Sequence, residues 1–371
     1  MIIAVFTHVI HTKSNEKYFG YGPYVKEMNL WFQNVSEVIL VAPLQSGKPD
    51  KIDIAYQAPK LTFITIPTLY FKSLKHFFRS IFLLPKMFFS IFRTMQKADH
   101  IHLRCPGNIG LLGCLVQIFF PKKKKSAKYA GNWDSQSKQP WSYKLQKYIL
   151  SNTFLTKNMQ VLVYGEWEHQ SQNIKSFFTA TYRESDKIEV PQRTFKIIRF
   201  VFAGTLSAGK RPMYALEIVH QLFQKGFPIQ FDFYGEGPER AFLENYIETN
   251  NLKNQVTLHG NQDEMTVRKA YQNAHFLLLP SKSEGWPKVV AEAMFWGCIP
   301  LATPVSCVSN MLENGRRGIL LTLNQETDVE KIETILHDQD QFNQMSQLAK
   351  NWSQFYTLDV FEKEIQKILS V

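Results

Sequence analysis

Short apolar segments alternate with longer amphipathic segments along almost the whole chain. The apolar runs predict strands, and the stretches between them predict helices. In the first half, we expect strands at Ile2–Thr7, Glu37–Ala42, Leu61–Ile66, His100–Arg104, Ser126–Ala130 and Gln160–Val163. In the second half, we expect them at Lys196–Ala203, Ile229–Tyr234, Gln255–His259, His275–Leu279, Ile299–Ala302 and Gly318–Leu320. Strands that alternate with helices are typical of parallel, doubly wound sheets.

A polar stretch, Tyr182–Thr194, separates the two series of strands. Because 371 residues exceed one ordinary core, we expect two Rossmann-like α/β domains, residues 1–185 and 195–350, followed by a C-terminal helix, 351–371. Ligands of such domains bind at the carboxyl ends of the parallel strands, so a binding cleft between the two domains is expected.

Composition and charge narrow the class of protein. A hydrophobic content of 44% and a charged content of 20% indicate a folded globular chain. The net charge of +11 indicates an acidic partner, such as nucleic acid, an anionic membrane surface or a phosphorylated substrate. The four cysteines lie in apolar stretches without metal-ligand spacing, which favours reduced structural thiols. We expect neither a signal peptide nor a transmembrane helix.

The segment 281–310, SKSEGWPKVVAEAMFWGCIPLATPVSCVSN, is the most informative part of the sequence. Two carboxylates, Glu284 and Glu292, stand with seven residues between them, and a turn beginning at Gly285 follows the first. Pro287 suits the start of a helix, which we expect over Lys288–Trp296. Amides at a helix N-terminus favour phosphate. A carboxylate beside them would repel an anion, so we expect it to accept hydrogen bonds from hydroxyl groups of a ligand instead.

This segment resembles the E-x7-E signature of retaining glycosyltransferases of family four, which have the GT-B fold. The resemblance implies that Glu284 contacts the donor sugar and that Glu292 holds the ribose hydroxyls. It implies that the amides of Lys288, Val289 and Val290 bind the donor diphosphate. It also implies a last helix that crosses back to the first domain. Within the family, the sequence is similar to bacterial surface-polysaccharide transferases.

Two further segments resemble the donor side of the same family. In FVFAGTLSAGKRP, Gly204 allows close backbone approach and Lys210 stands at the donor-phosphate lysine of the family's Gly-Arg-x4-Lys-Gly loop. Thr205 replaces the family arginine and Arg211 replaces the glycine, so Arg211 is the candidate for a second phosphate cation. In GEGP, Gly235 resembles the family's turn at the nucleotide edge, with a purely structural turn as the alternative.

The first half of the chain carries weaker candidates for the acceptor side. Gly20 and Gly22 resemble a flexible acceptor loop, although tight-turn glycines explain them equally well. The family often carries a His near the reacting sugar, but this chain reads KYAGNWD there, so Asn132 or Asp134 is expected to orient the acceptor. Arg104 at a strand end is either a cation facing the ligand or an ordinary paired arginine.

No metal ligands are supported by the sequence. Asp338 and Asp340 form an Asp-x-Asp pair, which we assign to a solvated helix face. We therefore expect a metal-independent enzyme without a cofactor, using a UDP- or GDP-linked sugar as donor. Two other functions remain open: a sugar-nucleotide epimerase of the same fold, and a non-catalytic, membrane-associated binder of nucleotide sugars.

The positive charge gathers in the first half. The Phe-rich stretch Tyr70–Lys97, with Pro85 inside it, places basic residues on one stripe of a helix, and Lys122–Lys125 with Lys128 adds a second patch. The stripe consists of Lys72, His76, Arg79, Lys86, Arg93 and Lys97. Such a surface suits an anionic bilayer. A half-buried helix with solvated lysines is the alternative, and no motif supports nucleic acid. We expect a cytoplasmic protein, peripheral on the inner membrane face, with a lipid-linked saccharide acceptor.

Overall fold

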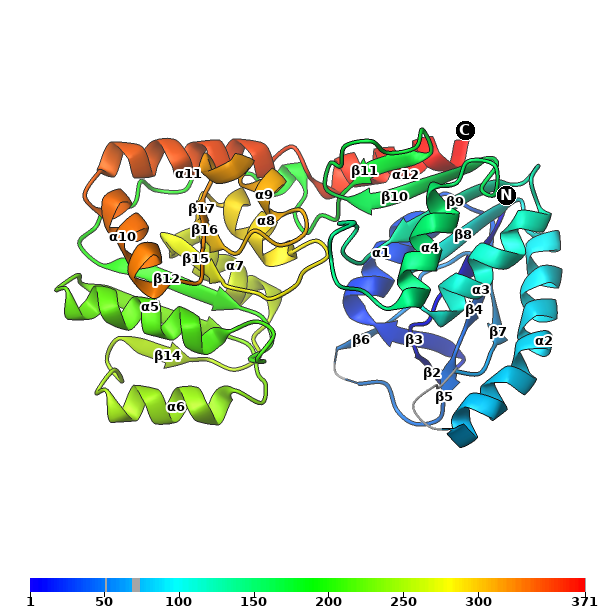
Figure 1. Cartoon of the computed structure of the whole chain (residues 1–371), viewed down its shortest axis with the longest axis horizontal. Helices are drawn as coiled ribbons and strands as arrows, with labels where there is room; N and C mark the ends of the chain where they lie inside the picture. Colours follow the sequence, from blue (N-terminus) through cyan, green and yellow to red (C-terminus); the bar gives the residue numbers. More distant parts are fainter. Residues whose placement is uncertain (51, 69–73, 371) are drawn as a thin grey trace. The chain divides into compact units, whose positions relative to one another are not determined.

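The computed structural model describes residues 1–50, 52–68 and 74–370, with the backbone alone for 74–81. The chain divides into two compact units (Figure 1). Unit 1 contains Met1–Phe177 together with the C-terminal residues from Glu362 onward, and unit 2 contains Phe178–Phe361. The last helix, α12 (Leu358–Ser370), therefore begins in unit 2 and continues in unit 1, as the expected return of the chain to the first domain requires.

The main sheet of unit 1 is parallel, with the order β11-β10-β9-β8-β1-β4-β7. Its strands are β1 (Ile2–Phe6), β4 (Glu37–Ala42), β7 (Leu61–Thr65), β8 (His100–Cys105), β9 (Lys124–Tyr129), β10 (Met159–Tyr164) and β11 (Ile174–Phe177). The central strands are buried on both faces because helices cover both sides of the sheet. The chain order reverses between β1 and β8, which marks the switch point of this unit.

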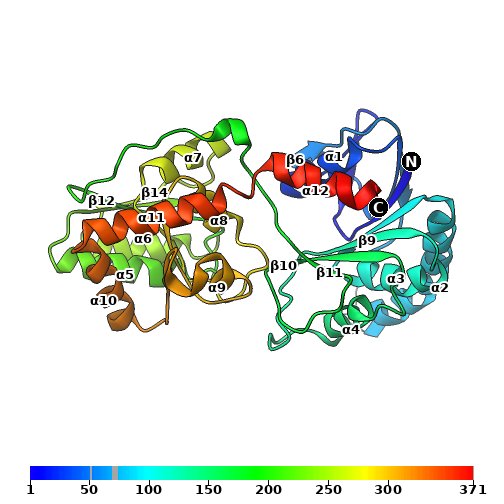
Figure 2. The ribbon, with the colours of Figure 1, turned by 90° about the horizontal axis from the view of Figure 1, so that it is seen from above.

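Helices on opposite faces cover this sheet, as Figure 2 shows. One face carries α2 (Leu74–Lys97), α3 (Asn108–Val116), the short helix η1 (Gln117–Phe119) and α4 (Trp141–Ser151). The other face carries α1 (Gly22–Phe32) and the later part of α12. Pro85 lies within α2, which continues through it. In the ranges that the structure describes, no helix is both long and apolar enough to cross a bilayer.

A small second sheet in unit 1 was missed in the sequence because its strands are short and polar. It has the order β5-β2-β3-β6, built from β2 (His11–Ser14), β3 (Lys17–Tyr21), β5 (Leu44–Gln45) and β6 (Asp53–Ala55). Gly20 therefore lies in a strand, and Gly22 begins α1. A Cβ on Gly22 would lie 2.5 Å from the Ile52 carbonyl oxygen. Neither a flexible loop nor a tight turn is found at these glycines, which lie at a packed strand–helix junction.

Unit 2 has a parallel sheet with the order β14-β13-β12-β15-β16-β17. The strands are β12 (Ile198–Ala203), β13 (Ile229–Tyr234), β14 (Val256–Leu258), β15 (Phe276–Leu279), β16 (Ile299–Ala302) and β17 (Ile319–Leu320). This is the strand order of a dinucleotide-binding Rossmann sheet, whose switch point lies between its first and fourth strands, here β12 and β15. Alternate positions of the neighbouring strands supply a phenylalanine core that includes Phe200, Phe202, Phe231 and Phe233.

Seven α-helices of the described chain lie entirely within unit 2. They are α5 (Pro212–Gln224), α6 (Arg240–Thr249), α7 (Glu264–Asn273), α8 (Lys288–Phe295), α9 (Val308–Met311), α10 (Gln325–Leu336) and α11 (Gln339–Ser353). The short helices η2 (Glu184–Asp186) and η3 (Glu313–Gly315) lie in the connections. The helix expected after Glu284 is α8. It packs against α11.

The C-terminal tail departs from the single helix expected from Asn351 onward. α11 ends at Ser353, and α12 begins only at Leu358, whose amide donates to the Tyr182 carbonyl oxygen at 2.8 Å. Trp352 and Tyr356 lie against Trp286 in unit 2, with ring centroids 6.3 Å and 6.1 Å away. The amphipathic period alone gives no sign of this break, where the Leu358 amide bonds to Tyr182 and the Val360 amide donates to the Thr357 hydroxyl at 3.4 Å.

Buried histidines make stability depend on pH. Burial lowers the pKa of His11, His100 and His275 to about 4. The unfolded chain therefore binds more protons below about pH 6.5, so the stability from these residues is present above that pH and is lost as pH falls toward 4. We expect His275→Gln to reduce the fall in melting temperature between pH 7.5 and pH 5. Between pH 7.5 and pH 5, native His275 should lower the free energy of unfolding by roughly 2 kcal/mol.

His169, whose side chain is 95% exposed, provides the control. His169→Gln should leave the pH dependence of the melting temperature unchanged. Equal pH slopes for His275→Gln and the unmodified protein would exclude His275 as a source of the acid sensitivity.

Candidate functional site

Two loops meet at the switch point of unit 2. One follows β12 and contains residues 204–211, and the other follows β15 and contains residues 280–287. The Lys282 amide donates to the Gly209 carbonyl oxygen at 2.8 Å, and the Arg211 guanidinium donates to the Pro280 carbonyl oxygen at 3.1 Å. These bonds join the loops at the carboxyl ends of adjacent strands, where ligands of doubly wound sheets bind. Arg211 thereby uses part of its donor capacity to link the loops.

The joined loops bring Lys210 and Glu284 together. The Lys210 ammonium forms an ion pair with Glu284 Oε1 across 74 residues of sequence. The Lys210 side chain is 29% exposed and that of Glu284 is 9% exposed. The pair places a compact cation, suited to phosphate, beside a carboxylate that can accept from hydroxyl groups. Two residues singled out separately in the sequence therefore belong to one site.

The N-terminus of α8 follows directly after this loop. Pro287 stands at the N-cap position directly before α8, which begins at Lys288 as expected, and no side chain caps the helix. The Val290 amide already donates to the Pro287 carbonyl oxygen at 3.0 Å, so it is not open to a ligand. Within the described residues, the amides of Lys288 and Val289 make no hydrogen bond, so the N-terminus of α8 presents two donors. The expected trio of amides is therefore reduced to two.

Glu292 lies in the second turn of α8. Its Oε1 accepts from the Thr181 hydroxyl at 2.6 Å, and its Oε2 lies 3.5 Å from the Tyr271 hydroxyl. Burial raises the pKa of Glu292, while the Thr181 bond and Lys288 oppose the rise. Sequence reasoning missed Thr181 and Tyr271, because neither lies near Glu292 in the chain. A small hollow opens beside Glu292 and is lined by Thr179, Ala180, Thr181, Tyr182, Lys288, Ala291, Phe295, Ser353 and Tyr356.

The glycine turn after β13 packs directly on the loop after β12. A Cβ on Gly235 would lie 2.0 Å from the Gly204 carbonyl oxygen, and one on Gly237 would lie 2.3 Å from that of Leu206. The Leu206 amide donates to the Glu236 carbonyl oxygen at 3.0 Å. The GEGP turn is therefore required for loop packing, while the neighbouring Thr205 stays exposed at the loop surface.

The acceptor candidates of unit 1 are engaged in internal contacts. Arg104 Nη1 lies 2.5 Å from Glu27 Oε1, and Lys128 Nζ lies 2.8 Å from Glu27 Oε2. All three side chains are at most 10% exposed. Arg104 is thus a paired strand-end arginine, and its partner Glu27 was missed because it lies on α1, 77 residues away in sequence. Lys128, expected in the surface patch, is buried.

Asn132 and Asp134 shape a turn after β9. The Asn132 carboxamide oxygen accepts from the Asp134 amide at 2.9 Å, and Asp134 Oδ1 accepts from the Gln136 amide at 2.8 Å. The Asp134 carbonyl oxygen accepts from Lys147, and burial lowers the pKa of Lys147 to about 8. These contacts give both candidates a local structural role.

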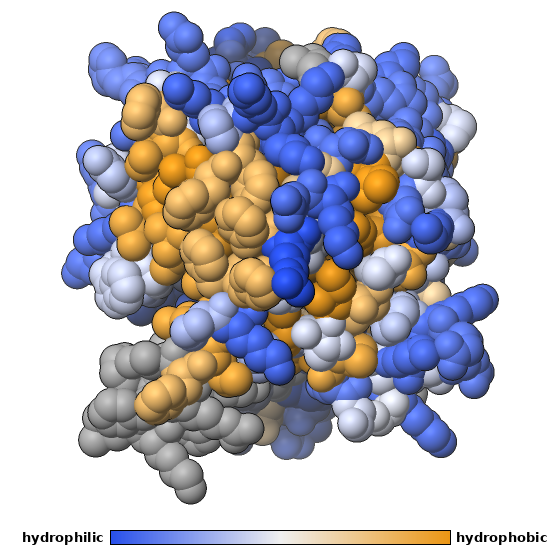
Figure 3. All heavy atoms as spheres, turned by 90° about the vertical axis from the view of Figure 1, so that its right-hand side faces the viewer, coloured by the Kyte–Doolittle hydropathy of each residue, from blue (hydrophilic) through white to orange (hydrophobic). Residues whose placement is uncertain are grey.

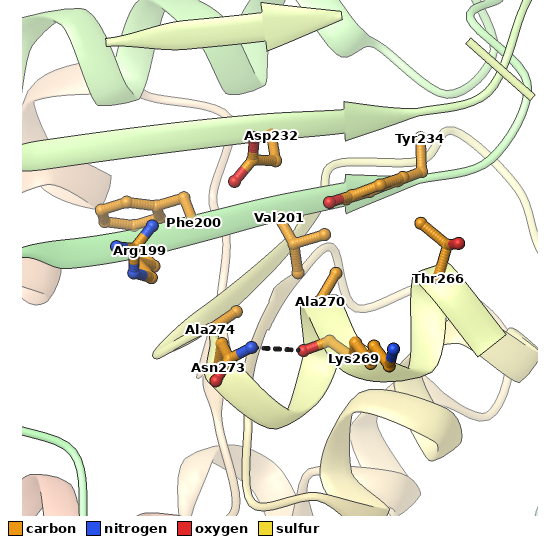
Figure 4. A pocket seen from close by; sticks show the side chains of 10 residues that line it. All are labelled: Arg199, Phe200, Val201, Asp232, Tyr234, Thr266, Lys269, Ala270, Asn273 and Ala274. Atoms are coloured by element: carbon orange, nitrogen blue, oxygen red, sulfur yellow. Dashed lines mark hydrogen bonds between the residues drawn. The ribbon is translucent and has the colours of Figure 1, made fainter. Parts of the chain in front are cut away.

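A larger pocket of about 550 Å³ lies elsewhere in unit 2, between the sheet and α7 (Figure 4). Asp232 and Tyr234 of β13 line one side of the pocket. Ala270 of α7, with its small side chain, lines the opposite side. The remaining lining residues are Arg199, Phe200, Val201, Thr266, Lys269, Asn273 and Ala274. None of the donor-binding candidates lines this pocket.

Potential metal ligands are not gathered in the described ranges: no group of three or more His, Cys, Asp or Glu side chains is placed to hold a metal ion. Asp338 caps α11 by accepting from the Gln341 amide at 2.9 Å, and Asp340 lies in the first turn of that helix.

Sequence comparison places the switch-point loops within a known family. Residues 184–352 match the family described as "Glycosyl transferases group 1". This segment is a glycosyltransferase group 1 domain. The alpha-D-kanosaminyltransferase of Streptomyces kanamyceticus is 26% identical over 150 residues, which cover 40% of this chain and 39% of that enzyme. Protein CapJ of Staphylococcus aureus is 22% identical over 305 residues, which cover 78% of this chain and 75% of CapJ.

Solved structures extend the likeness to the fold of both units. The complex of Anabaena HepE with UDP has a TM-score of 0.66 and 12% identity, covering 100% of this chain and 99% of HepE. The complete chain thus has the GT-B fold of two Rossmann-like units. The group 1 domain corresponds to unit 2, and its candidate site is made by the loops of Lys210 and Glu284 with α8.

The glycine contact between the loops of the group 1 domain can be tested with two matched substitutions. Gly235 and Gly204 both have φ of +144°, but a Cβ meets the Gly204 carbonyl oxygen at 2.0 Å in the first case and no atom within 4 Å in the second. Gly204→Ala should cost about 1–3 kcal/mol from backbone strain. Gly235→Ala should cost at least about 2 kcal/mol more from overpacking, measured by denaturant unfolding. Equal losses would contradict the backbone contact.

Proposed function

We propose that the protein is a retaining glycosyltransferase that moves a sugar from a nucleotide-sugar donor to a saccharide or lipid-linked acceptor. The observation that carries the proposal is the meeting of Lys210 and Glu284 beside the N-terminus of α8, at the switch point of a group 1 domain. The kanosaminyltransferase named above supports sugar transfer, and the UDP in the HepE complex supports a nucleotide-sugar donor, which we propose to be UDP- or GDP-linked.

In this proposal, unit 2 binds the donor. The diphosphate lies against the amides of Lys288 and Val289, with Gly204 and Gly285 allowing its close approach. Lys210 changes its partner from Glu284 to the diphosphate, with Arg211 and Thr205 beside it. Glu284 then accepts from hydroxyl groups of the sugar, and Glu292 accepts from the ribose. Gly235 acts indirectly, by holding the loop after β12.

The chemical step breaks the bond between the anomeric carbon and the diphosphate oxygen, and forms a bond from that carbon to an acceptor hydroxyl oxygen, whose proton passes to the departing diphosphate or to solvent. Negative charge grows on the departing diphosphate, where Lys210 and the two amides stabilise it. Such electrostatic stabilisation is the largest contribution in many enzymes. Because cations and amides take this role, we propose that the reaction needs no metal ion.

The acceptor and location complete the proposal. Unit 1 binds the acceptor, and the protein attaches peripherally to the inner face of the cytoplasmic membrane, acting in surface-polysaccharide synthesis. The resemblance of the whole sequence to bacterial surface-polysaccharide transferases supports this role. Since Asn132, Asp134 and Arg104 are engaged internally, no side chain is assigned to orient the acceptor hydroxyl.

A panel of UDP- and GDP-linked sugars, each with and without a lipid-linked saccharide acceptor, tests the function. We expect acceptor-dependent release of nucleotide with one donor, and a glycosylated product with the anomeric configuration of that donor by NMR. The rate should persist in EDTA. A new sugar isomer without transfer would indicate an epimerase, and binding without turnover would indicate a non-catalytic binder. An EDTA loss restored by magnesium or manganese would contradict metal independence.

Substitutions at Lys210 and Glu292 should affect different kinetic quantities. Lys210→Ala should lower turnover at saturating donor by at least about tenfold, because the charge that Lys210 meets grows toward the transition state. Glu292→Ala should weaken nucleotide binding by about 1.5–3 kcal/mol, the value of a hydrogen bond to a charged group. Calorimetry measures the affinity and initial rates measure the turnover.

Lys282→Ala is the matched control for both substitutions, because Lys282 is an exposed lysine on the same loop as Glu284. It should change neither quantity. Wild-type turnover in Lys210→Ala would remove Lys210 from the mechanism, and unchanged affinity in folded Glu292→Ala would remove the ribose contact.

A further inference from the structure

The positive charge of the chain is concentrated in one segment of unit 1. Residues 54–165 contain 17 Lys and Arg but only two Asp and Glu, a net charge of +15, whereas the whole chain carries +11. The rest of the chain is therefore net negative. The segment includes α2, α3, η1 and α4, the helices that cover one face of the unit 1 sheet.

The same helical layer exposes large apolar side chains. Phe82 is 82% exposed, Phe89 53%, Phe119 63% and Leu115 38%. Phe119 of η1 lies 6.1 Å and 6.2 Å, between ring centroids, from Phe88 and Phe92 of α2, so the two elements form one continuous surface. Figure 3, which views the side of the molecule where α2 lies, shows a broad apolar area with hydrophilic residues around and across it. Large exposed patches of this kind mark interaction sites.

Basic side chains border these apolar residues. Lys86, Arg93 and Lys97 are exposed on α2, and the Arg93 guanidinium lies 4.1 Å from the centre of the Phe89 ring. Exposed Lys122 and Lys124 follow η1. We name the set of Phe82, Phe89, Leu115, Phe119, Lys86, Arg93, Lys97, Lys122 and Lys124 the aromatic–basic face.

The structure changes the membership of the basic surface expected from sequence. Lys125 is buried and donates to Gln117 Oε1 at 2.8 Å, and Lys128 pairs with Glu27, so neither belongs to it. Lys72 lies outside the described residues. His76 and Arg79 lie on α2, in the part where only the backbone is described. Asp99, the acidic residue next in sequence after α2, accepts from the Ile2 amide at 2.7 Å.

We propose that the aromatic–basic face docks on an anionic bilayer, with its phenylalanines in the acyl boundary and its basic residues at the lipid phosphates. The proposal deepens the peripheral attachment proposed above and does not depend on sugar transfer. We infer an anionic bilayer as the partner because the basic side chains complement its charge and the apolar side chains match its acyl region. Phenylalanines that project from helices beside lysine and arginine match the chemistry of interfacial helices. Binding of single-stranded nucleic acid would instead place aromatic residues along a basic groove.

This mode of docking combines two contributions that respond differently to salt. Attraction between basic side chains and anionic lipid is screened within about 10 Å at 0.1 M salt. Burial of exposed phenylalanine is insensitive to such screening and is strengthened by salts that are excluded from protein surfaces. Binding should therefore decrease at high salt but reach a plateau, rather than vanish.

Vesicle flotation of the full chain tests the face. Vesicles of phosphatidylcholine alone and of phosphatidylcholine with phosphatidylglycerol are compared at low and high sodium chloride. The aromatic variant carries Phe82→Ser, Phe89→Ser and Phe119→Ser, and the basic variant carries Lys86→Gln, Arg93→Gln and Lys97→Gln. Each variant should lower the bound fraction on anionic vesicles at least about tenfold at low salt. The aromatic variant alone should abolish the plateau at high salt.

Two matched controls keep the result specific. Phe242 on α6 of unit 2 is 63% exposed, the same as Phe119, so Phe242→Ser should leave flotation unchanged. Trp141 and Tyr148 on α4 are 73% and 64% exposed, and Trp141→Ser with Tyr148→Ser should also leave it unchanged. Thermal melting confirms that each variant is folded.

The outcomes distinguish two hypotheses: that the protein attaches to membranes, and that it does so through the aromatic–basic face. If the unmodified protein floats and the aromatic variant floats equally well, the aromatic–basic face is wrong although attachment stands. Loss in the α4 variant alone would place the docking surface on α4. Absence of flotation with anionic vesicles would overturn both, and preferential capture by single-stranded nucleic acid in a parallel filter assay would assign the face to that ligand. Sugar transfer to a water-soluble acceptor remains a separate measurement.

Discussion

The candidate site depends on the approach of backbone to backbone at Gly204 and Gly235. With no side chain between them, the loop after β12 and the turn after β13 pack at a separation that excludes a Cβ. Two hydrogen bonds then attach the loop after β15 to the loop after β12. They join Lys282 to Gly209 and Arg211 to Pro280. Lys210 and Glu284 meet because the loops that carry them are fixed in this way, and the ion pair is a consequence of the packing.

The alternation of apolar and amphipathic segments predicted the large sheets well. Parallel strands buried on both faces have a dense apolar signal, and β13 and β16 have the predicted bounds. The small sheet of unit 1 was invisible to the same reasoning, because strands such as Lys17–Tyr21 are short and partly exposed. The break between α11 and α12 was also missed, since it involves a hydrogen bond to Tyr182, 176 residues away.

The site shows the same division between local and distant information. Spacing in sequence suffices to place Glu284 and Glu292 around the start of one helix, because eight residues of loop and helix have little conformational freedom. It does not reveal that the Val290 amide is used by Pro287, which depends on the detailed geometry of the first turn. It also cannot pair Arg104 and Lys128 with Glu27, since that contact needs β8, β9 and α1 to be assembled. Residues that look like free cations in sequence thereby become core ion pairs.

The bond between Thr181 and Glu292 links the carboxylate to the main-chain crossing between the units. Thr181 lies three residues after Phe178, the first residue of unit 2 at that crossing, and its hydroxyl lies 2.6 Å from Glu292 Oε1. A ligand that displaces the Thr181 hydroxyl from this oxygen competes with Thr181 for it. Thermodynamic reciprocity then applies: whatever holds Thr181 against α8 weakens such a ligand, and the ligand in turn loosens Thr181 by the same factor. The crossing segment and the carboxylate thus share one coupled equilibrium.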